Sequence, residues 1–275
     1  MMTTTEVWAQ LPQWLELPDE VQTSFAQYDA QYTPQVDDAL RSRLLCRDTW
    51  DDALAELRQR LAPDPTGLRM LWELLHVACG TYARYVERGI SQEIFVETMK
   101  FCTRFLHTYY QEHGCYHFAW DWWFPRQLAM LEYRVGCLEY ELIDGEAPLI
   151  SVHIPSDADL SAEAVDASMA EFDAFLRRYY PQWVHRDWYC ESWMMSPTLR
   201  ELLPEGSRIL AFQSRFTVLE EDKNSPAVMD WVFRGCGTDP AQLPEDTTLR
   251  RNLKRLLLQG GNVGWTKAVL RRSEA

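Results

Sequence analysis

Hydrophobic and polar positions in the first 115 residues repeat with the period of an α-helix. From Asp48 to Leu61 and from Leu68 to Val86, apolar side chains recur three and four residues apart, which places them on one helical face. Gly89 then provides a helix stop. Ser91 can cap a third helix, whose apolar face carries Phe95, Met99, Cys102, Phe105, Leu106 and Tyr109. The pattern predicts a helical N-terminal half.

From Tyr133 the apolar period changes to two residues, which is typical of β-strands. The segment from Tyr133 to Ile143 changes phase near Gly136 and Cys137, so we expect one strand with a β-bulge at that point. The segment from Leu149 to Ile154 also alternates and stops at Pro155. These patterns predict two strands joined by a short turn.

The remaining chain alternates between helical and strand patterns. A helix is expected from Ser161 to Tyr179, with Val165, Met169, Phe172, Leu176 and Tyr179 turned inward. Further elements are expected as follows: a strand from Asp187 to Met195, a short helix from Pro197 to Leu203, a strand from Ile209 to Leu219, a helix from Asp246 to Gln259 and a weak strand from Val263 to Leu270. Helices followed by a mixed sheet predict an α+β fold, with a helical domain at residues 1–118 and a sheet domain at residues 119–275.

Charge excludes some classes of partner. The 275 residues carry a net charge of −14, which opposes general binding to DNA, RNA or anionic membranes. A basic cluster near the C-terminus is an exception, and we interpret it mainly as a solvated helix face; it comprises Arg250, Arg251, Lys254, Arg255, Lys267, Arg271 and Arg272.

The seven cysteines contain no Cys-x-x-Cys pair, and several, such as Cys79 and Cys102, fall on apolar faces. This predicts reduced, buried thiols in a cytoplasmic protein. The N-terminus has no basic and apolar pattern of a signal peptide, and no apolar run approaches 18 residues. We therefore expect neither export nor a membrane span.

The order of elements from Tyr133 resembles the acyl-CoA-dependent acyltransferases of the GNAT type. More specifically, four sequence words resemble a bacterial family of acyltransferase-domain proteins that joins a helical N-terminal region to a GNAT-like C-terminal domain. They read RVGCLEYEL, LISVHIPSDADLSAEAVDASMAEF, YCESWMMSPTLRELLPEGSRILAFQSRF and LRRNLKRLLLQGGNVG. The resemblance covers most of the chain.

The resemblance implies an arrangement of the sheet and a co-substrate. The strand at Leu149–Ile154 would be the central strand, the strand at Asp187–Met195 would lie parallel beside it, and the helix from Ser161 would cross between them. In GNAT enzymes these two strands part, and the acyl-pantetheine arm enters the gap. Acyl-CoA is then a co-substrate and no permanently bound cofactor is expected.

The same resemblance places the CoA pyrophosphate on the loop before the crossover helix, near Ile154, Ser156 and Ser161. This chain departs from the family pattern there, because the loop has no glycine and carries Asp157 and Asp159. A carboxylate about 8 Å from a phosphate charge costs roughly 2 kcal/mol at an effective dielectric near 20, while a helix N-terminus returns about 0.3–1 kcal/mol. A conventional site therefore needs Arg or Lys from elsewhere, and the C-terminal basic cluster is a candidate.

Amine acylation needs a base for the amine and an acid for the departing thiolate. Glu139 and Glu141 share a strand face and either could be a base, although a solvent-facing sheet surface explains them too. His153 lies at the end of the central strand. It could be the base, or a structural histidine held by hydrogen bonds. Glu191 could line the same gap, or pair with an arginine such as Arg215. Tyr189 is the tyrosine best placed to act as the acid, and the alternative is that it packs in the core. The short helix that often carries the acid in the superfamily has no tyrosine here.

Two other readings stay open. His113, Cys115 and His117 lie two residues apart and would point the same way on a strand, but a zinc site needs a further ligand; no metal is expected. A protein without catalysis, which binds a ligand or partner on the same fold, is the alternative to an N-acyltransferase. The expected acceptor is the amine of a small molecule or peptide, and the sequence gives no oligomeric state.

Overall fold

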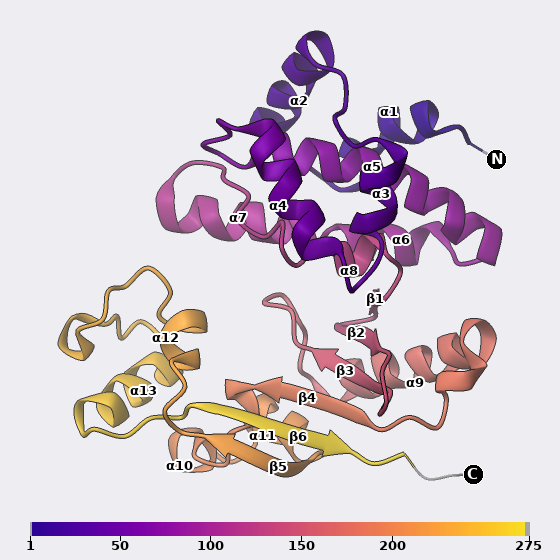
Figure 1. The fold of residues 1–275 in the computed structure, drawn as a ribbon. Helices are drawn as coiled ribbons and strands as arrows, with labels where there is room; N and C mark the ends of the chain where they lie inside the picture. Colours follow the sequence, from indigo (N-terminus) through magenta and orange to yellow (C-terminus); the bar gives the residue numbers. More distant parts are fainter. Residues whose placement is uncertain (1, 273–275) are drawn as a thin grey trace. The chain divides into compact units, whose positions relative to one another are not determined.

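The computed structural model describes residues 2–272 and divides into two compact units, residues 1–135 and 136–275 (Figure 1). The first unit is mostly helical, and the second carries a mixed sheet with helices, which confirms the predicted α+β class. None of the described helices is long and apolar enough to cross a membrane. The domain boundary expected between residues 118 and 119 stays a prediction, because compactness does not test which segment folds alone.

The first unit contains the helices that the apolar period predicts. The helix expected from residue 91 is interrupted at Lys100, and Gly89 ends the preceding helix with a φ of 71°. The elements are α1 (Thr4–Trp14), α2 (Asp19–Gln31), α3 (Asp38–Leu44), α4 (Trp50–Leu61), α5 (Leu68–Arg88), α6 (Gln92–Met99), α7 (Phe101–His113), α8 (Pro125–Leu128) and the strand β1 (Glu132–Val135).

Helix α5 is the centre of this unit, and α1, α2, α4 and α6 pack around it. Most of its side chains are buried, among them Trp72, Leu75 and Tyr85. Burial also raises the pKa of the Cys79 and Cys102 thiols to about 12. All seven cysteines are free thiols, but only Cys79, Cys102 and Cys190 are buried, so the expected burial holds for three of them.

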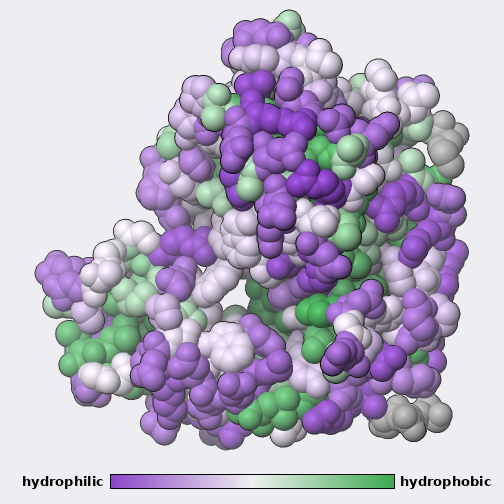
Figure 2. Space-filling view, in the orientation of Figure 1, coloured by the Kyte–Doolittle hydropathy of each residue, from purple (hydrophilic) through white to green (hydrophobic). Residues whose placement is uncertain are grey.

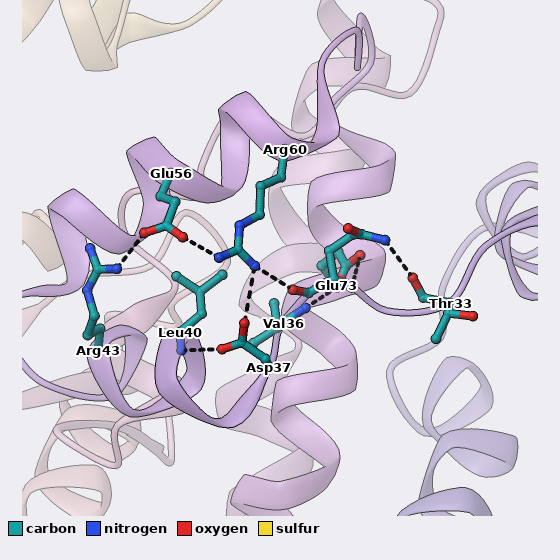
Figure 3. A network of polar contacts seen from close by, with 9 residues as sticks. Thr33, Val36, Asp37, Leu40, Arg43, Glu56, Arg60 and Glu73 are labelled. Atoms are coloured by element: carbon teal, nitrogen blue, oxygen red, sulfur yellow. Dashed lines mark hydrogen bonds and ion pairs between the residues drawn. The ribbon is translucent and has the colours of Figure 1, made fainter.

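A buried carboxylate on α5 fixes the segment between α2 and α3 (Figure 3). The side chain of Glu73 is fully buried and accepts hydrogen bonds from the backbone N–H groups of Gln35, at 2.8 and 2.9 Å, and of Val36, at 3.3 Å. Arg60 of α4 donates to the Gln35 carbonyl at 3.0 Å and pairs with Asp37. These contacts satisfy backbone groups that no helix or strand would satisfy.

The second unit contains a sheet with the strand order β2-β3-β4-β6-β5. Strands β3 and β4 are parallel, and the other neighbours are antiparallel. The elements are β2 (Leu138–Ile143), β3 (Leu149–His153), α9 (Ala162–Tyr179), a 3-10 turn (Pro181–Trp183), β4 (Trp188–Ser192), a 3-10 turn (Trp193–Met195), α10 (Leu199–Leu202), α11 (Arg208–Gln213), β5 (Thr217–Asp222), α12 (Ala227–Trp231), a 3-10 turn (Pro240–Gln242), α13 (Thr248–Leu258) and β6 (Trp265–Leu270).

Helix α9 is the predicted crossover between β3 and β4, and it packs on one face of the sheet. Ser161 caps it by accepting from the N–H of Ala164. Phe172 stacks on Tyr140 of β2, with ring centroids 3.9 Å apart, and contacts Trp188 of β4. Because neighbouring residues of a strand point to opposite faces, the alternate residues of β2, β3 and β4 lie on the face away from α9.

The expected single bulged strand from Tyr133 to Ile143 is wrong. The segment is two strands, β1 and β2, with a two-residue turn at Gly136 and Cys137. The φ of Gly136 is 62°, and a Cβ there would lie 2.9 Å from the Cβ of Ser168. The change of phase in the sequence therefore comes from a turn that needs glycine, and not from a bulge.

The expected strand from Ile209 to Leu219 is also wrong over most of its length. Its first half is the helix α11, where Gln213 donates to the carbonyls of Met194 and Ser196 at 2.7 and 2.9 Å. Only the end of the segment belongs to β5. The strand expected up to Met195 stops at Ser192, whose hydroxyl accepts from the N–H of Met194 and begins a 3-10 turn.

A second small core lies beneath α10, α12 and α13, and its fully or nearly fully buried members are Leu199, Val228, Phe233, Leu243, Leu253 and Val263. Figure 2 shows hydrophobic surface over α12 and α13, where Leu258 is exposed. The basic residues of α13 pair locally, Arg250 with Asp246 and Lys254 with Glu245. The side chains of Arg250 and Lys254 are 34% and 14% exposed and also donate to the Val232 and Leu243 carbonyls, so these two residues are less solvated than we expected.

Candidate functional site

The central strands of the second unit separate after two residue pairs. Ile150 pairs with Trp188 and Ser151 with Tyr189, and among the described residues the ladder between β3 and β4 registers no further pair. The outer edges stay paired along their length: β2 follows β3 as far as His153, and β6 follows β4 as far as Ser192. The carboxyl ends of β3 and β4 therefore border a split in the sheet, with its apex at Ser151 and Tyr189.

All five residues proposed for catalysis lie on the sheet face opposite α9. The registers place Glu139 beside His153, Glu141 beside Ser151, and Glu191 one alternation beyond Tyr189. Continuing the β3 and β4 register would bring His153 opposite Glu191, so the split opens between these two residues. One face thus presents acid and base groups on both borders of the split.

On the β3 side, His153 forms a close pair with Glu141. The imidazole Nε2 lies 3.1 Å from Glu141 Oε2, and the side chains are 23% and 4% exposed. Glu139 is buried as well. The solvent-facing surface considered for Glu139 and Glu141 is therefore wrong, since both carboxylates are removed from water. A buried carboxylate beside an imidazole fixes the ring and stabilises the imidazolium that proton transfer creates.

On the β4 side, Glu191 pairs with a residue that the sequence placed only in the C-terminal basic cluster. Lys267 Nζ of β6 lies 2.8 Å from Glu191 Oε1 and 5.3 Å from the ring centroid of Tyr189. The hydrogen bond from Lys267 to Glu191 raises the pKa of the lysine. The expected partner, Arg215, instead binds Asp166 at 2.7 Å. In sequence, Lys267 is the only charged residue within Trp265–Leu270, which is the one signal that could have indicated it.

The loop after β3 meets α11 at the N-terminus of α9. Asp159 accepts from the N–H and hydroxyl of Ser161 at 2.9 and 3.0 Å, and the backbone donor lowers the pKa of the carboxyl. Arg208 donates to Asp159 at 3.0 Å, and Arg215 donates to the Ala162 carbonyl at 3.4 Å. Arg208 of α11 and Arg215, in the turn after it, therefore bring positive charge to this loop, each paired with a carboxylate.

The C-terminal basic cluster does not supply this charge through the contacts seen here. Arg271 pairs with Asp187 at 2.5 Å, and Arg272 pairs with Asp173, which lies in the second half of α9. Ile154 and Ser156 lie in the loop between β3 and Ser161, so this loop contains all three residues expected near the pyrophosphate. The sequence did not indicate Arg208, and it named Arg215 only as a possible partner of Glu191, because the segment from Ile209 to Leu219 was expected to be a strand.

The alternative metal site is not assembled. His113 ends α7, and residues 114–118 are not a strand. The rings of His113 and His117 pack on Tyr109, with centroids 4.2 and 4.8 Å away, and Cys115 is exposed. Within residues 2–272 these three side chains do not form a group of ligand atoms within 4.8 Å of one another.

Two family models match the chain. Residues 126–270, more than half of the chain, match the GNAT-like C-terminal domain, and residues 8–130 match the N-acyltransferase N-terminal domain. The chain belongs to the GNAT-like C-terminal domain family. The resemblance drawn from the sequence words is thereby confirmed, and the split between β3 and β4 lies inside the matched GNAT-like region.

Solved acyltransferase structures share the fold. One, in complex with decanoyl-CoA and teicoplanin, is similar over 98% of this chain and 88% of its own, with a TM-score of 0.78 and 22% identity. A mutant acyltransferase in complex with octanoyl-CoA has a TM-score of 0.77 and 22% identity over 96% of this chain and 87% of its own. A third, with CoA and 10C-teicoplanin, has a TM-score of 0.70 and 20% identity over 99% and 100%. No curated protein matches the chain.

Proposed function

We propose that this GNAT-like protein is an N-acyltransferase that moves an acyl group from acyl-CoA to an amine. One observation carries the proposal: β3 and β4 part after Ser151 and Tyr189 while their outer edges remain paired. Parting leaves two facing strand edges that can bind the amides of a thin pantetheine arm. The acyl-CoA complexes of the similar structures support the same co-substrate.

The phosphates of CoA bind at the open end of the split, at the loop holding Ile154, Ser156 and Ser161. The N–H groups at the start of α9 face this loop and favour an anion. Arg208 offsets the charge of Asp159, with which it forms an ion pair 3.0 Å long, and Arg215 lies beside the first turn of α9. Arg208 and Arg215 therefore replace the missing glycine-rich loop as the source of affinity.

His153 is the base of the reaction. It takes a proton from the acceptor ammonium, and Glu141 holds the ring and stabilises the imidazolium. The neutral amine then attacks the thioester carbonyl and the C–N bond forms. As the C–S bond breaks, the nitrogen gives its second proton to water, which leaves an amide and the CoA thiolate. Glu139 adds negative charge that attracts the ammonium to this face, Glu191 holds Lys267 at the β4 border, and Tyr189 lies at the apex beside the thioester.

The acceptor is the amine of a small molecule or a peptide. Two similar structures contain teicoplanin or 10C-teicoplanin, which supports an acceptor of this general kind without naming it. The free thiols fit a reducing compartment, so we place the protein in the cytoplasm of a bacterial cell.

Thermal unfolding with decanoyl-CoA and octanoyl-CoA tests binding, and mass spectrometry of a panel of amines tests turnover. A ligand at a hundred times its Kd stabilises the folded state by about 2.7 kcal/mol. Since about 1 kcal/mol shifts the Tm of a chain of this size by about 2–4 °C, we expect the Tm to rise by roughly 5–10 °C. An acylated amine should form together with CoA thiol. An unchanged Tm at millimolar acyl-CoA contradicts the proposal and favours a binding protein without catalysis.

A further inference from the structure

We propose that the ammonium group of Lys267 stabilises the CoA thiolate as it leaves, which makes this lysine a catalytic residue of the acyl transfer. The inference rests on the proposed acyltransferase function. It assigns the leaving-group side of the reaction, for which the short helix α10 and the residues around it offer no tyrosine.

The position of Lys267 carries the inference. Lys267 of β6 is the register partner of Glu191 on β4, and its ammonium lies 2.8 Å from Glu191 Oε1 and 5.3 Å from the ring centroid of Tyr189. Tyr189 belongs to the last pair of the β3 and β4 ladder, so the cation lies near the apex of the split. If the pantetheine arm of acyl-CoA enters at the open end of the split, beside the N-terminus of α9, its thioester sulfur points toward this apex.

The chemistry needs a cation there and not an acid. When the C–S bond breaks, its electron pair stays on sulfur and forms a thiolate, whose parent thiol has a pKa of about 8.5. Because the Glu191 contact raises the pKa of Lys267, the lysine keeps its proton and acts through charge. The thiolate then leaves with CoA and takes a proton from water. Glu191 holds the ammonium in place before the reaction.

The ion pair contributes little to folding. The side chains of Lys267 and Glu191 are 29% and 38% exposed, and exposed pairs of this kind stabilise proteins weakly. Replacing Lys267 should therefore leave the fold and the Tm nearly unchanged. This separates a catalytic role from a structural one, since only the catalytic role affects the rate of C–S cleavage.

The test compares Lys267→Met and Lys267→Arg with the wild type, using decanoyl-CoA and hydroxylamine as a small amine probe. For Lys267→Met we expect kcat to fall about a hundredfold, as for loss of one donor that stabilises charge in a transition state, with the KM for decanoyl-CoA changed less than threefold. Lys267→Arg should restore most of the rate. Lys254→Met is the matched control, because Lys254 pairs with Glu245 at 2.7 Å on α13, outside the sheet.

A second substrate gives a readout that a structural role would not move. The decanoyl thioester of thiophenol releases a more acidic thiol than CoA, so its departure needs less stabilisation. The loss in Lys267→Met should shrink at least fivefold with this substrate. An equal loss with both thioesters, or a full rate in Lys267→Met, overturns the role of Lys267. Absence of any wild-type turnover would instead contradict the acyltransferase proposal itself.

Discussion

The imidazole of His153 lies 3.1 Å from a buried carboxylate oxygen of Glu141, and the two residues come from adjacent antiparallel strands. The pair is held by the sheet itself, because Glu141 pairs in register with Ser151, two residues before His153. A rigid strand positions a catalytic pair more accurately than a loop does. The pair stands at the border of the split, where the amine and the thioester would meet.

His153→Ala should lower kcat for acyl transfer by about 10²–10⁴-fold, since that is the usual contribution of a general base. Glu141→Gln should lower it less, because the base remains but loses its stabilising charge. Rates with saturating decanoyl-CoA, alongside circular dichroism, measure both effects. Replacement of the exposed His185 by Ala is the control. A wild-type rate in His153→Ala would remove this residue from the mechanism.

Arg208 and Asp159 should change the KM for acyl-CoA in opposite directions. Arg208→Met removes a cation near the phosphates, so the KM for decanoyl-CoA should rise. Asp159→Asn keeps a side-chain oxygen that can accept from Ser161 but removes the negative charge, so the KM should fall. After screening by solvent, each change should be about threefold to tenfold. Arg200→Met, on the exposed side of α10, is the control. Unchanged KM values in both variants would place the phosphates elsewhere.

The Glu73 network should stabilise the first unit. Glu73→Ala leaves the N–H groups of Gln35 and Val36 without their buried acceptor, and we expect the free energy of unfolding to fall by about 2–4 kcal/mol. Urea unfolding measures the change. Replacing the exposed Glu87 of the same helix by Ala should cost less than about 0.5 kcal/mol. Equal effects of the two substitutions would show that the hydrogen bonds do not matter.

His76 should make the stability depend on pH. Burial lowers the pKa of its imidazole from 6.5 to about 4; the ring stacks on Trp8 at 3.8 Å and lies 3.8 Å from Asp29 Oδ1. Between these pH values the unfolded state binds more protons than the folded state, so stability is complete above pH 6.5 and falls as the pH drops toward 4.

His76→Gln removes this proton uptake. On acidification, the free energy of unfolding of the wild type should fall by about 1–2 kcal/mol more than that of the variant, after a discount for the partial exposure of His76. Urea unfolding at pH 7 and pH 4.5 measures it, with His185→Gln as the control. Parallel losses of stability in His76→Gln and the wild type would contradict the assignment.

Sequence predicted the elements whose pattern is long and regular. Helices α4, α5 and α9 follow their apolar periods, and β3 and β4 appear where alternation is uninterrupted. The family resemblance also predicted that β3 and β4 are parallel and part near their ends. Alternation further placed Glu139 and Glu141 on one face, but it could not show that this face is buried, because burial depends on residues distant in sequence.

The failures have local causes. Leu210, Phe212 and Phe216 fit both a strand period and a helix followed by a turn, and the hydrogen bonds of Gln213 to two distant carbonyls decide for the helix. That error hid the start of a helix at Arg208, whose side chain binds Asp159. Lys267 was read as part of a basic cluster because its role depends on β6 lying beside β4, a pairing between segments more than 70 residues apart.

The central claim is that the thioester arm occupies the split between β3 and β4, and amide hydrogen exchange with and without decanoyl-CoA tests it most directly. We expect new protection in residues 150–161 and 188–196, where the strand edges and the α9 N-terminus would receive hydrogen bonds, while β5 is unchanged. Protection that spares both β3 and β4 while decanoyl-CoA is bound would contradict the account.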